Sequence, residues 1–385
     1  MTSALRIVHC FRSPVGGIFR HVRDLTEAQV AAGHQVGIVC DSTTGGAFEE
    51  KLFEEMRPLL ALGIRRTAMQ RHIGPGDLAS GWRTYRLIKE LQPDVLHGHG
   101  AKGGAYSRLF GSLMRVSGSR VARLYTAHGG SLHYDENTLT GKVFFLLERI
   151  MERFCDRLLF VSEYERGTFI RKVGLPRIPS ALVYNGLRDA EFEPVATAPG
   201  AADFVYIGMM RDLKGPDLFI DALARTEMRL GRAVSAVMVG DGEDRPRYIA
   251  QVERLGLSDR VKFLMPMPAR EAFGLGRVSV VPSRAEAMPY IVLETLGAGR
   301  PMIATAVGGI PEVFGEGSAA LAQPDVEEIS ERMVLALSDP ETFAMAMPST
   351  EELRTRFSAR TMAAEIENAY WAALGREPTA GEMVS

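Results

Sequence analysis

Residues 278–311 have the sequence VSVVPSRAEAMPYIVLETLGAGRPMIATAVGGIP, and the architecture of the chain can be worked out from them. Val278 to Val281 is a short apolar run, which is typical of a buried strand. Tyr290 to Leu296 is predicted to be a helix that begins after Pro289 and ends at the glycines that follow. Met302 to Thr305 begins a second strand. Strand, helix and strand in this order form a βαβ unit, which predicts a parallel sheet covered by helices.

Two glutamates of this stretch are candidates for ligand binding. Glu286 lies in the loop after the first strand, and Glu294 lies about one turn inside the helix, so both carboxylates can face one cleft at the carboxyl end of the strand. The N–H groups of such a loop and helix N-terminus suit sugar hydroxyls or phosphate, and a carboxylate there can accept hydrogen bonds from a ribose diol. On spacing alone, a βαβ unit with two surface glutamates explains the pattern equally well.

The two glutamates are eight residues apart and are flanked by proline–serine and glycine–proline elements: Glu286-x7-Glu294, Pro282-Ser283, Gly299-x-Pro301 and Gly308-Gly309-x-Pro311-Glu312. This combination resembles the E-x7-E signature of the retaining GT-B glycosyltransferases of family GT4, the glycosyl transferases group 1. The resemblance implies an α/β fold of the GT-B type. Two Rossmann-like domains would face each other across a deep cleft, and a C-terminal helix would cross back to the first domain.

The length of 385 residues also favours two domains, because single cores stop growing well below that size. We expect an N-terminal acceptor-binding domain at residues 1–190 and a nucleotide-sugar-binding domain at 203–355. Residues 356–375 would form the crossing helix. Leu187 to Asp203, rich in Ala, Pro and acidic residues, is predicted to be the linker.

Composition indicates a soluble globular protein, since 46% hydrophobic and 24% charged residues are ordinary values. No window approaches the roughly 18 apolar residues of a membrane span, and Met1 leads straight into strand-like Leu5 to Phe11 without a signal-peptide pattern. We therefore expect a cytoplasmic protein. Cys10, Cys40 and Cys155 are isolated in apolar contexts, which predicts reduced core thiols.

Charge is distributed unevenly along the chain. Residues 1–190 hold 26 Lys/Arg against 18 Asp/Glu, whereas residues 191–385 hold 19 against 29. A basic first half suggests an anionic partner, and basic and apolar residues of two segments could form a face for anionic membrane lipid. These are Arg108, Arg115, Arg120, Arg123, Leu109, Phe110, Leu113, Met114, Phe144 to Leu147, Arg149, Arg153 and Arg157. Solvated charges around an ordinary core are the competing interpretation. No aromatic–basic interleaving supports nucleic-acid binding.

The second half contains a further glycine-rich loop, Gly208-Met-Met-Arg-Asp-Leu-Lys-Gly215, after a predicted strand. The family resemblance implies that Arg211 and Lys214 grip the diphosphate of the donor. The sequence departs from the usual G-R-L-x-x-x-K-G form, because Met209 takes the place of the Arg and Arg211 lies two residues further on. Salt-bridged surface cations are the alternative.

In the first half, three strand-to-helix loops carry the candidate residues. Gly16-Gly17 with Arg20 resembles the family's N-terminal loop near the donor phosphates and acceptor. His97-Gly-His99 and Lys102 would contact the acceptor. Zinc is a tempting alternative for His-x-His, but no Cys or acidic ligand accompanies it, so we predict no metal site. In GT4 enzymes a His at the station of His128 contacts the donor sugar near the reacting carbon.

The resemblance thus implies three sets of functional residues. We assign catalysis to His128, Arg211, Lys214 and Glu286, and acceptor binding to Arg20, His99 and Lys102. Donor binding is assigned to Gly16, Gly17, Gly240, Met265, Met288, Pro289, Tyr290, Ile291 and Glu294.

The expected activity is retaining transfer of a hexose from a UDP- or GDP-sugar to a glycan, such as a lipid-linked or cell-surface precursor of lipopolysaccharide or exopolysaccharide. The chain contains no Asp-x-Asp, the usual metal-binding pair, so we expect no metal or other cofactor. Two alternatives remain: a GT-B sugar-nucleotide epimerase and a non-catalytic nucleotide-sugar-binding protein.

Overall fold

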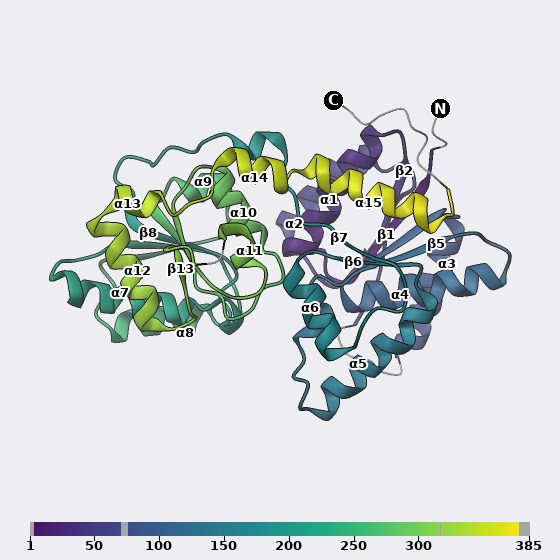
Figure 1. Ribbon diagram of the computed structural model, residues 1–385, viewed down its shortest axis with the longest axis horizontal. Coiled ribbons are helices and arrows are strands. Elements are labelled where there is room, and N and C mark those ends of the chain that lie inside the picture. The colour runs from purple at the N-terminus through teal and green to yellow at the C-terminus, as the bar shows by residue number, and fades with distance from the viewer. Residues whose placement is uncertain (1–3, 71–75, 316, 377–385) are drawn as a thin grey trace. The chain divides into compact units, whose positions relative to one another are not determined.

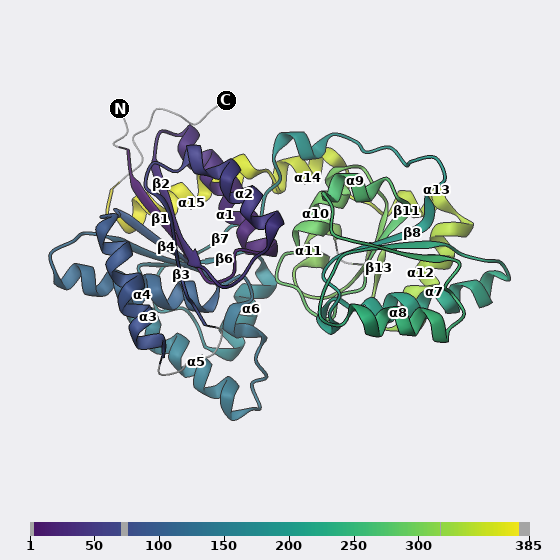
Figure 2. The ribbon, with the colours of Figure 1, turned by 180° about the vertical axis from the view of Figure 1, so that it is seen from behind.

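The computed structural model describes residues 4–70, 76–315 and 317–376 (Figures 1 and 2). Contacts divide the chain into two compact units. Unit 1 comprises Met1–Gly186 and Ala359–Ser385, and unit 2 comprises Leu187–Ser358. The chain therefore leaves unit 1 once and returns to it with its last helix.

Unit 1 is built on a parallel sheet with the strand order β3-β2-β1-β4-β5-β6-β7. Its strands are β1 (Arg6–Phe11), β2 (Gln35–Asp41), β3 (Gly63–Thr67), β4 (Val95–His99), β5 (Ala122–Thr126), β6 (Arg157–Phe160) and β7 (Ser180–Leu182). The connecting helices are α1 (Gly16–Ala31), α2 (Ala47–Met56), α3 (Gly76–Glu90), α4 (Gly100–Val116), α5 (Leu139–Met151) and α6 (Glu163–Lys172). The strand order reverses between β1 and β4, and open α/β sheets bind ligands at such a point.

The last helix, α15 (Ala359–Ala373), belongs to unit 1 and lies beside α1 (Figures 1 and 2). Its Tyr370 and Trp371 are buried in a cluster with apolar residues of the sheet, including Ile7 and Val95. Burial of two large aromatic side chains fastens the returning helix to the first sheet.

Unit 2 repeats this architecture with the strand order β10-β9-β8-β11-β12-β13. The strands are β8 (Ala202–Ile207), β9 (Ala236–Val239), β10 (Val261–Leu264), β11 (Gly276–Val281), β12 (Met302–Thr305) and β13 (Leu321–Ala322). The helices are α7 (Pro216–Leu230), α8 (Arg245–Arg254), α9 (Ala269–Phe273), α10 (Tyr290–Gly297), α11 (Ile310–Phe314), α12 (Val326–Ser338), α13 (Pro340–Ala344) and α14 (Thr350–Arg356). Here the order reverses between β8 and β11, again marking the ligand-binding edge.

The βαβ prediction for residues 278–311 is confirmed, with β11, α10 and β12 at the expected places. All strand pairs within the two sheets are parallel, because each crossover is supplied by a helix. The predicted α/β class with two Rossmann-like domains is likewise confirmed.

The segment from Leu187 to Asp203 differs from the predicted linker, since it packs as part of unit 2. Leu187 and Phe192 are buried, and the Val195 N–H donates to the Ala298 carbonyl at 3.0 Å. Gly297 makes room for this packing, because a Cβ there would lie 2.7 Å from Leu187 Cδ1. The Ala/Pro composition concealed these two apolar anchors.

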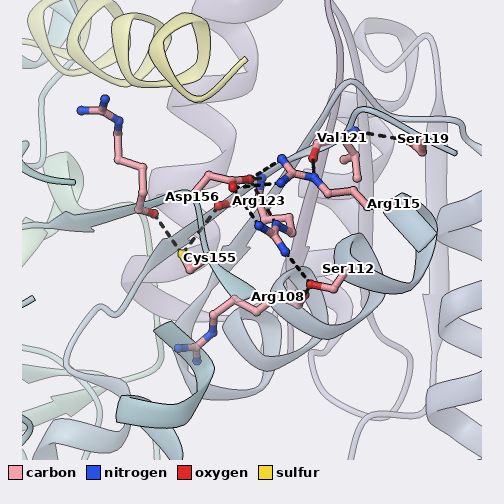
Figure 3. Close-up of polar contacts among 9 residues, drawn as sticks. Arg108, Ser112, Arg115, Ser119, Val121, Arg123, Cys155 and Asp156 are labelled. Carbon is pink, nitrogen blue, oxygen red and sulfur yellow. Dashed lines mark hydrogen bonds and ion pairs between the residues drawn. The ribbon is translucent and has the colours of Figure 1, made fainter. Parts of the chain in front are cut away.

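The basic residues of unit 1 also differ from the expected lipid-facing set (Figure 3). Arg108 is buried and pairs with Glu148 at 2.7 Å, while Arg115 and Arg123 both pair with Asp156, at 2.6 and 2.8 Å. Phe110 and Met114 are buried as well. These charges are neutralised inside the unit, because a buried arginine requires a carboxylate partner.

Two further findings bear on the sequence expectations. All three cysteines are buried free thiols, and burial raises the pKa of Cys40 and of Cys155 to about 12.

Across the residues that the structure describes, we find no helix whose length and apolar character would let it pass through a bilayer.

Candidate active site

The centre of the candidate site in unit 2 is an ion pair across the strand reversal. Lys214 closes the short 3₁₀ helix Asp212–Lys214 in the loop after β8, and Glu286 lies in the loop after β11. Lys214 Nζ is 2.5 Å from Glu286 Oε1, and the Ser283 hydroxyl donates to the same oxygen at 2.7 Å. Glu286 is only 9% exposed, so these two donors stabilise a carboxylate that has lost most of its water.

An arginine from the same stretch clamps the two loops together. Arg284 donates through both terminal nitrogens to the Asp217 carboxylate, at 2.9 and 2.5 Å, and its backbone N–H donates to the Leu213 carbonyl at 2.9 Å. The pair holds the pKa of Asp217 below its usual value, although partial burial opposes that shift. A bidentate pair fixes geometry as well as charge, so Arg284 orients the loops that carry Lys214 and Glu286.

Glycines allow the loops at this edge to approach each other closely. A Cβ on Gly215 would collide with the Pro282 carbonyl, and one on Gly308 would collide with the Glu286 carbonyl. Gly240, predicted to bind the donor, plays the same part, because a Cβ there would strike the carbonyl of Gly208. At these positions glycine is required by the neighbouring backbone as well as by its own positive φ.

The other residues of unit 2 that were predicted to bind the donor lie on or just before α10, or after β10. Met288 and Tyr290 are buried, Ile291 and Glu294 are half-buried on α10, and Pro289 is the N-cap residue of that helix. The N-terminus of α10 therefore points out of the same loop that carries Glu286, where its N–H groups favour an anion. Arg211 is exposed one residue before the 3₁₀ helix, and Met265 after β10 is exposed.

Unit 1 carries the other predicted residues at its own strand reversal. Gly16 has a φ of +64° and begins α1 together with Gly17. Arg20 on α1 pairs with Asp24 at 2.6 Å, and Lys102 on α4 donates to the Gln70 carbonyl at 2.7 Å. These two cations thus have partners within the unit.

His128 stands out by its backbone. It follows β5 with a φ of +49°, a left-handed conformation that is rare for a histidine. The next residue, Gly129, donates its N–H to Oε1 of buried Glu165 at 2.5 Å, and burial raises the pKa of Glu165 to about 7. Strained backbone conformations of this kind cluster at functional sites.

The fold surrounds His128 with histidines that the sequence analysis did not connect. His99 Nδ1 lies 3.1 Å from His128 Nε2, and His99 Nε2 lies 3.0 Å from His9 Nδ1. His9 Nε2 contacts Gln29 Oε1 at 2.8 Å, and Gln29 donates to the Tyr370 hydroxyl at 3.2 Å. A buried chain of hydrogen bonds therefore runs from the candidate residue to the returning helix.

Two further histidines complete the cluster. His97 contacts the Tyr370 hydroxyl at 2.7 Å and Thr126 at 2.8 Å, and His21 Nδ1 lies 3.1 Å from Asn185 Oδ1. Burial lowers the pKa of His9 and of His21 to about 4, and it lowers the pKa of the other three rings well below the usual value. The cluster is consequently neutral at physiological pH.

The sequence predicted some residues of each arrangement but not the residues that support them. It identified Lys214, Glu286, His99 and His128, but not the supporting Arg284, His9 and Gln29. A signal was present in the strand register, since His9 on β1 is paired with His97 on β4. That register becomes visible only once the sheet order is known.

Comparison with known proteins agrees with this architecture. The crystal structure of Anabaena HepE in complex with UDP-glucose superposes with a TM-score of 0.77 at 18% identity, covering 95% of this chain and 99% of that one. The structure of WaaG, a glycosyltransferase involved in lipopolysaccharide biosynthesis, gives 0.67 at 16% identity, with 97% and 100% covered. The fold is therefore that of the GT-B glycosyltransferases.

Two protein-family models match the chain, one in each half. The model for Glycosyltransferase Family 4 matches residues 15–191, and that for Glycosyl transferases group 1 matches residues 188–359. The chain belongs to this GT4-type family of sugar transferases. Among its relatives are the glycogen synthase of Mycobacterium tuberculosis (23% identical, over 93% of this chain and 92% of the relative) and one component of the phosphatidylinositol N-acetylglucosaminyltransferase of Arabidopsis thaliana (25%, over 84% and 71%).

Proposed function

We propose that this protein transfers a hexose, with retention of anomeric configuration and without a metal ion, from a UDP- or GDP-sugar to a lipid-linked or cell-surface glycan precursor. The observation that carries the proposal is the Lys214–Glu286 contact, which joins a cation and a carboxylate at the ligand-binding edge of the unit 2 sheet.

Departure of a nucleoside diphosphate builds negative charge on its outer phosphate while the anomeric carbon becomes oxocarbenium-like. An ammonium has three N–H donors, so Lys214 can hold Glu286 and a phosphate oxygen at once. Arg211, exposed directly before the 3₁₀ helix, and the N-terminus of α10 would add positive potential. Together these groups would replace a divalent cation.

Glu286 would bind sugar hydroxyls and stabilise the positive charge at the reacting carbon. Glu294 would accept hydrogen bonds from the ribose diol, one to two turns into α10. Because no second carboxylate is assigned as a nucleophile, we favour attack on the face that the leaving phosphate vacates, with that phosphate accepting the proton of the acceptor. His128 would contact the donor sugar.

Solved relatives support the type of donor. The structures of Anabaena HepE contain UDP-glucose, or UDP and glucose. The structure of starch synthase IV from Arabidopsis thaliana contains ADP and acarbose. Incubation with UDP-, GDP- and ADP-sugars and measurement of nucleotide release would identify the donor of this chain. Loss of turnover with a chelator and its recovery with Mn²⁺ would contradict the metal-free part of the proposal.

The epimerase alternative predicts a different product. NMR of the donor incubated alone would show an isomerised sugar or its nucleotide products if the chain were an epimerase. A transferase would leave the donor configuration unchanged and would release nucleotide faster when acceptor is added. A protein that binds donor but releases nothing with any acceptor would favour the non-catalytic alternative.

Peripheral contact with a membrane rests on exposed apolar residues rather than on the paired arginines. On α5 the exposed apolar side chains recur at helical spacing: Leu139, Val143, Leu146, Leu147 and Ile150. Helix α4 has a similar exposed apolar face, formed by Leu109, Leu113 and Val116. A stripe of this kind can enter the interfacial layer of a bilayer, where a lipid-linked acceptor would be presented.

Liposome pelleting tests this surface. We expect Leu139→Gln with Leu146→Gln to reduce binding to anionic vesicles, whereas Met228→Gln, at an equally exposed position of α7, should not. Equal binding of both variants, or no binding by the original chain, would remove membrane contact from the proposal.

A further inference from the structure

Five buried or partly buried histidines converge in unit 1, and the sequence predicted roles for only two of them, His99 and His128. His9, His21, His97, His99 and His128 come from β1, α1, β4 and the loop after β5. Two overlapping groups have ring nitrogens within 4.8 Å of one another, namely His9–His97–His99 and His21–His99–His128. Neutral imidazoles at this spacing are ligands suited to a borderline transition-metal ion.

Hydrogen bonds decide which nitrogen of each ring carries a lone pair. Gln29 turns its amide nitrogen to Tyr370, so its oxygen accepts from His9 Nε2. His9 Nδ1 must then accept the proton of His99 Nε2, which leaves the lone pair of His99 on Nδ1. That nitrogen is the one that faces His128, whose Nε2 donates the proton of this contact. Metal binding at His128 Nε2 would therefore move that proton to Nδ1 of the same ring.

A hydrogen bond also fixes the tautomer of His21. Its Nδ1 contacts Asn185 Oδ1 at 3.1 Å, and an amide oxygen can only accept, so the lone pair of His21 resides on Nε2. Metal-binding histidines characteristically donate their second ring N–H to such an acceptor, which fixes the tautomer and the ring plane. Both His21 and His99 have this support.

Hydrogen bonding to residues outside the cluster distinguishes the two groups, since the closest nitrogens are 3.0 Å apart in one group and 3.1 Å apart in the other. Zn–N bonds of about 2.0–2.1 Å place two nitrogens of a tetrahedral site about 3.3–3.4 Å apart. His99 Nδ1 and His128 Nε2 are separated by 3.1 Å, and the rings of His21 and His128 meet edge to face with centroids 4.7 Å apart. In the other group, His97 engages both ring nitrogens with Tyr370 and Thr126, so coordination there would break a hydrogen bond to a partner outside the cluster. An ion held by His99 and His128 would replace only the contact between those two rings.

We propose that His21, His99 and His128 form a binding site for a divalent cation of the Zn²⁺ type, with a fourth position left for water, and that an ion bound there inhibits the enzyme. Inhibition would follow because coordination holds the His128 ring away from the donor sugar. This second part rests on the proposed function, whereas metal binding does not. The transfer reaction itself would still require no metal.

Binding is tested without substrates, on the untagged chain of 385 residues after chelator treatment. Titration with Co²⁺ should give one equivalent of tetrahedral d–d absorption, which Zn²⁺ displaces. We expect His21→Ala and His99→Ala each to weaken Co²⁺ binding at least tenfold. Two control variants should bind Co²⁺ as tightly as the original chain: His133→Ala, at an exposed position, and His97→Ala, within the cluster. Circular dichroism and thermal unfolding of each variant would identify a binding loss caused by misfolding.

Because a folding defect would obscure the alanine variants, Zn²⁺-induced thermal stabilisation of the original chain gives a second measurement. Absence of both the cobalt spectrum and zinc stabilisation overturns the site. Undiminished Co²⁺ binding by a folded His99→Ala variant also overturns it. If His97→Ala lost Co²⁺ binding while His21→Ala retained it, the ion would belong to the His9–His97–His99 group and the proposed site would be wrong.

Inhibition is then measured by nucleotide release once a donor is known. Zn²⁺ should slow the original chain, and it should slow His21→Ala far less relative to that variant's own metal-free rate. A chain that binds one Co²⁺ but transfers no sugar would refute the proposed function and leave the metal site intact. A chain that transfers sugar at an unchanged rate with Zn²⁺ bound would overturn the inhibitory role.

Discussion

Lys214 and Glu286 lie 72 positions apart in the chain, yet their ammonium nitrogen and carboxylate oxygen are 2.5 Å apart in unit 2. The contact joins the loops after β8 and β11, where the strand order reverses. In the proposed function this partly buried pair would present a cation and an anion to one ligand, which suits the opposite charges that develop when a sugar leaves a diphosphate.

Replacing Lys214 should mainly slow turnover. We expect Lys214→Ala to reduce kcat by about 10²- to 10³-fold, the usual cost of removing one donor to a developing oxyanion, with a smaller change in KM. Lys214→Arg should recover part of the rate, since it retains the charge. Steady-state kinetics check this, and a variant with raised KM but unchanged kcat would assign Lys214 to ground-state binding alone.

Glu294→Ala should weaken nucleotide binding. Loss of charged hydrogen bonds to a ribose diol corresponds to roughly 10- to 100-fold in Kd, which calorimetry with UDP or GDP would measure. Glu341→Ala, an exposed glutamate on α13, is the control and should bind normally. If Glu294→Ala bound the nucleotide with undiminished affinity, the ribose would lie elsewhere.

Alanine substitutions at Gly308 and Gly299 separate two effects of an added Cβ: strain from a positive φ, and collision with a neighbouring backbone. Both have a positive φ, +62° and +65°, but only the Cβ of Gly308 would collide with the Glu286 backbone, whereas that of Gly299 would meet nothing within 4 Å. Gly299→Ala should therefore cost about 1–2 kcal/mol of stability and preserve activity. Gly308→Ala should cost more and displace Glu286, with a fall in kcat. Similar kinetics for the two variants would argue against a role for this close approach.

The histidine cluster predicts a pH dependence of stability. The pKa of His9 and of His21 is lowered in the fold from 6.5 to about 4, so the unfolded chain binds more protons between these values. The free energy of unfolding should be highest above about pH 6.5 and fall as the pH decreases toward 4, by at most about 3 kcal/mol for each ring.

His9→Gln should reduce the loss of stability between pH 7 and pH 5, and denaturant unfolding at the two pH values measures it. The exposed His133→Asn serves as the control and should behave like the original chain. An identical pH dependence in His9→Gln would mean that His9 titrates normally in the fold.

Local patterns predicted the βαβ order around Glu286 because strand and helix periodicities depend on neighbouring residues. They also located Glu294 on α10 and Lys214 in the loop after β8, since loop position follows from element order. The same reasoning misjudged Arg108 and Arg123, because a charge count cannot tell an exposed arginine from one paired with Glu148 or Asp156.

The amino-acid sequence by itself determined the family, the two α/β halves and the spacing of the two glutamates, all of which are properties of short segments. Tertiary structure decided which distant groups meet: Arg284 with Asp217, and His9, His21, His97 and His99 around His128. The physical reason is that these contacts depend on strand order and register, and parallel strands adjacent in the sheet are separated in the chain by whole helices.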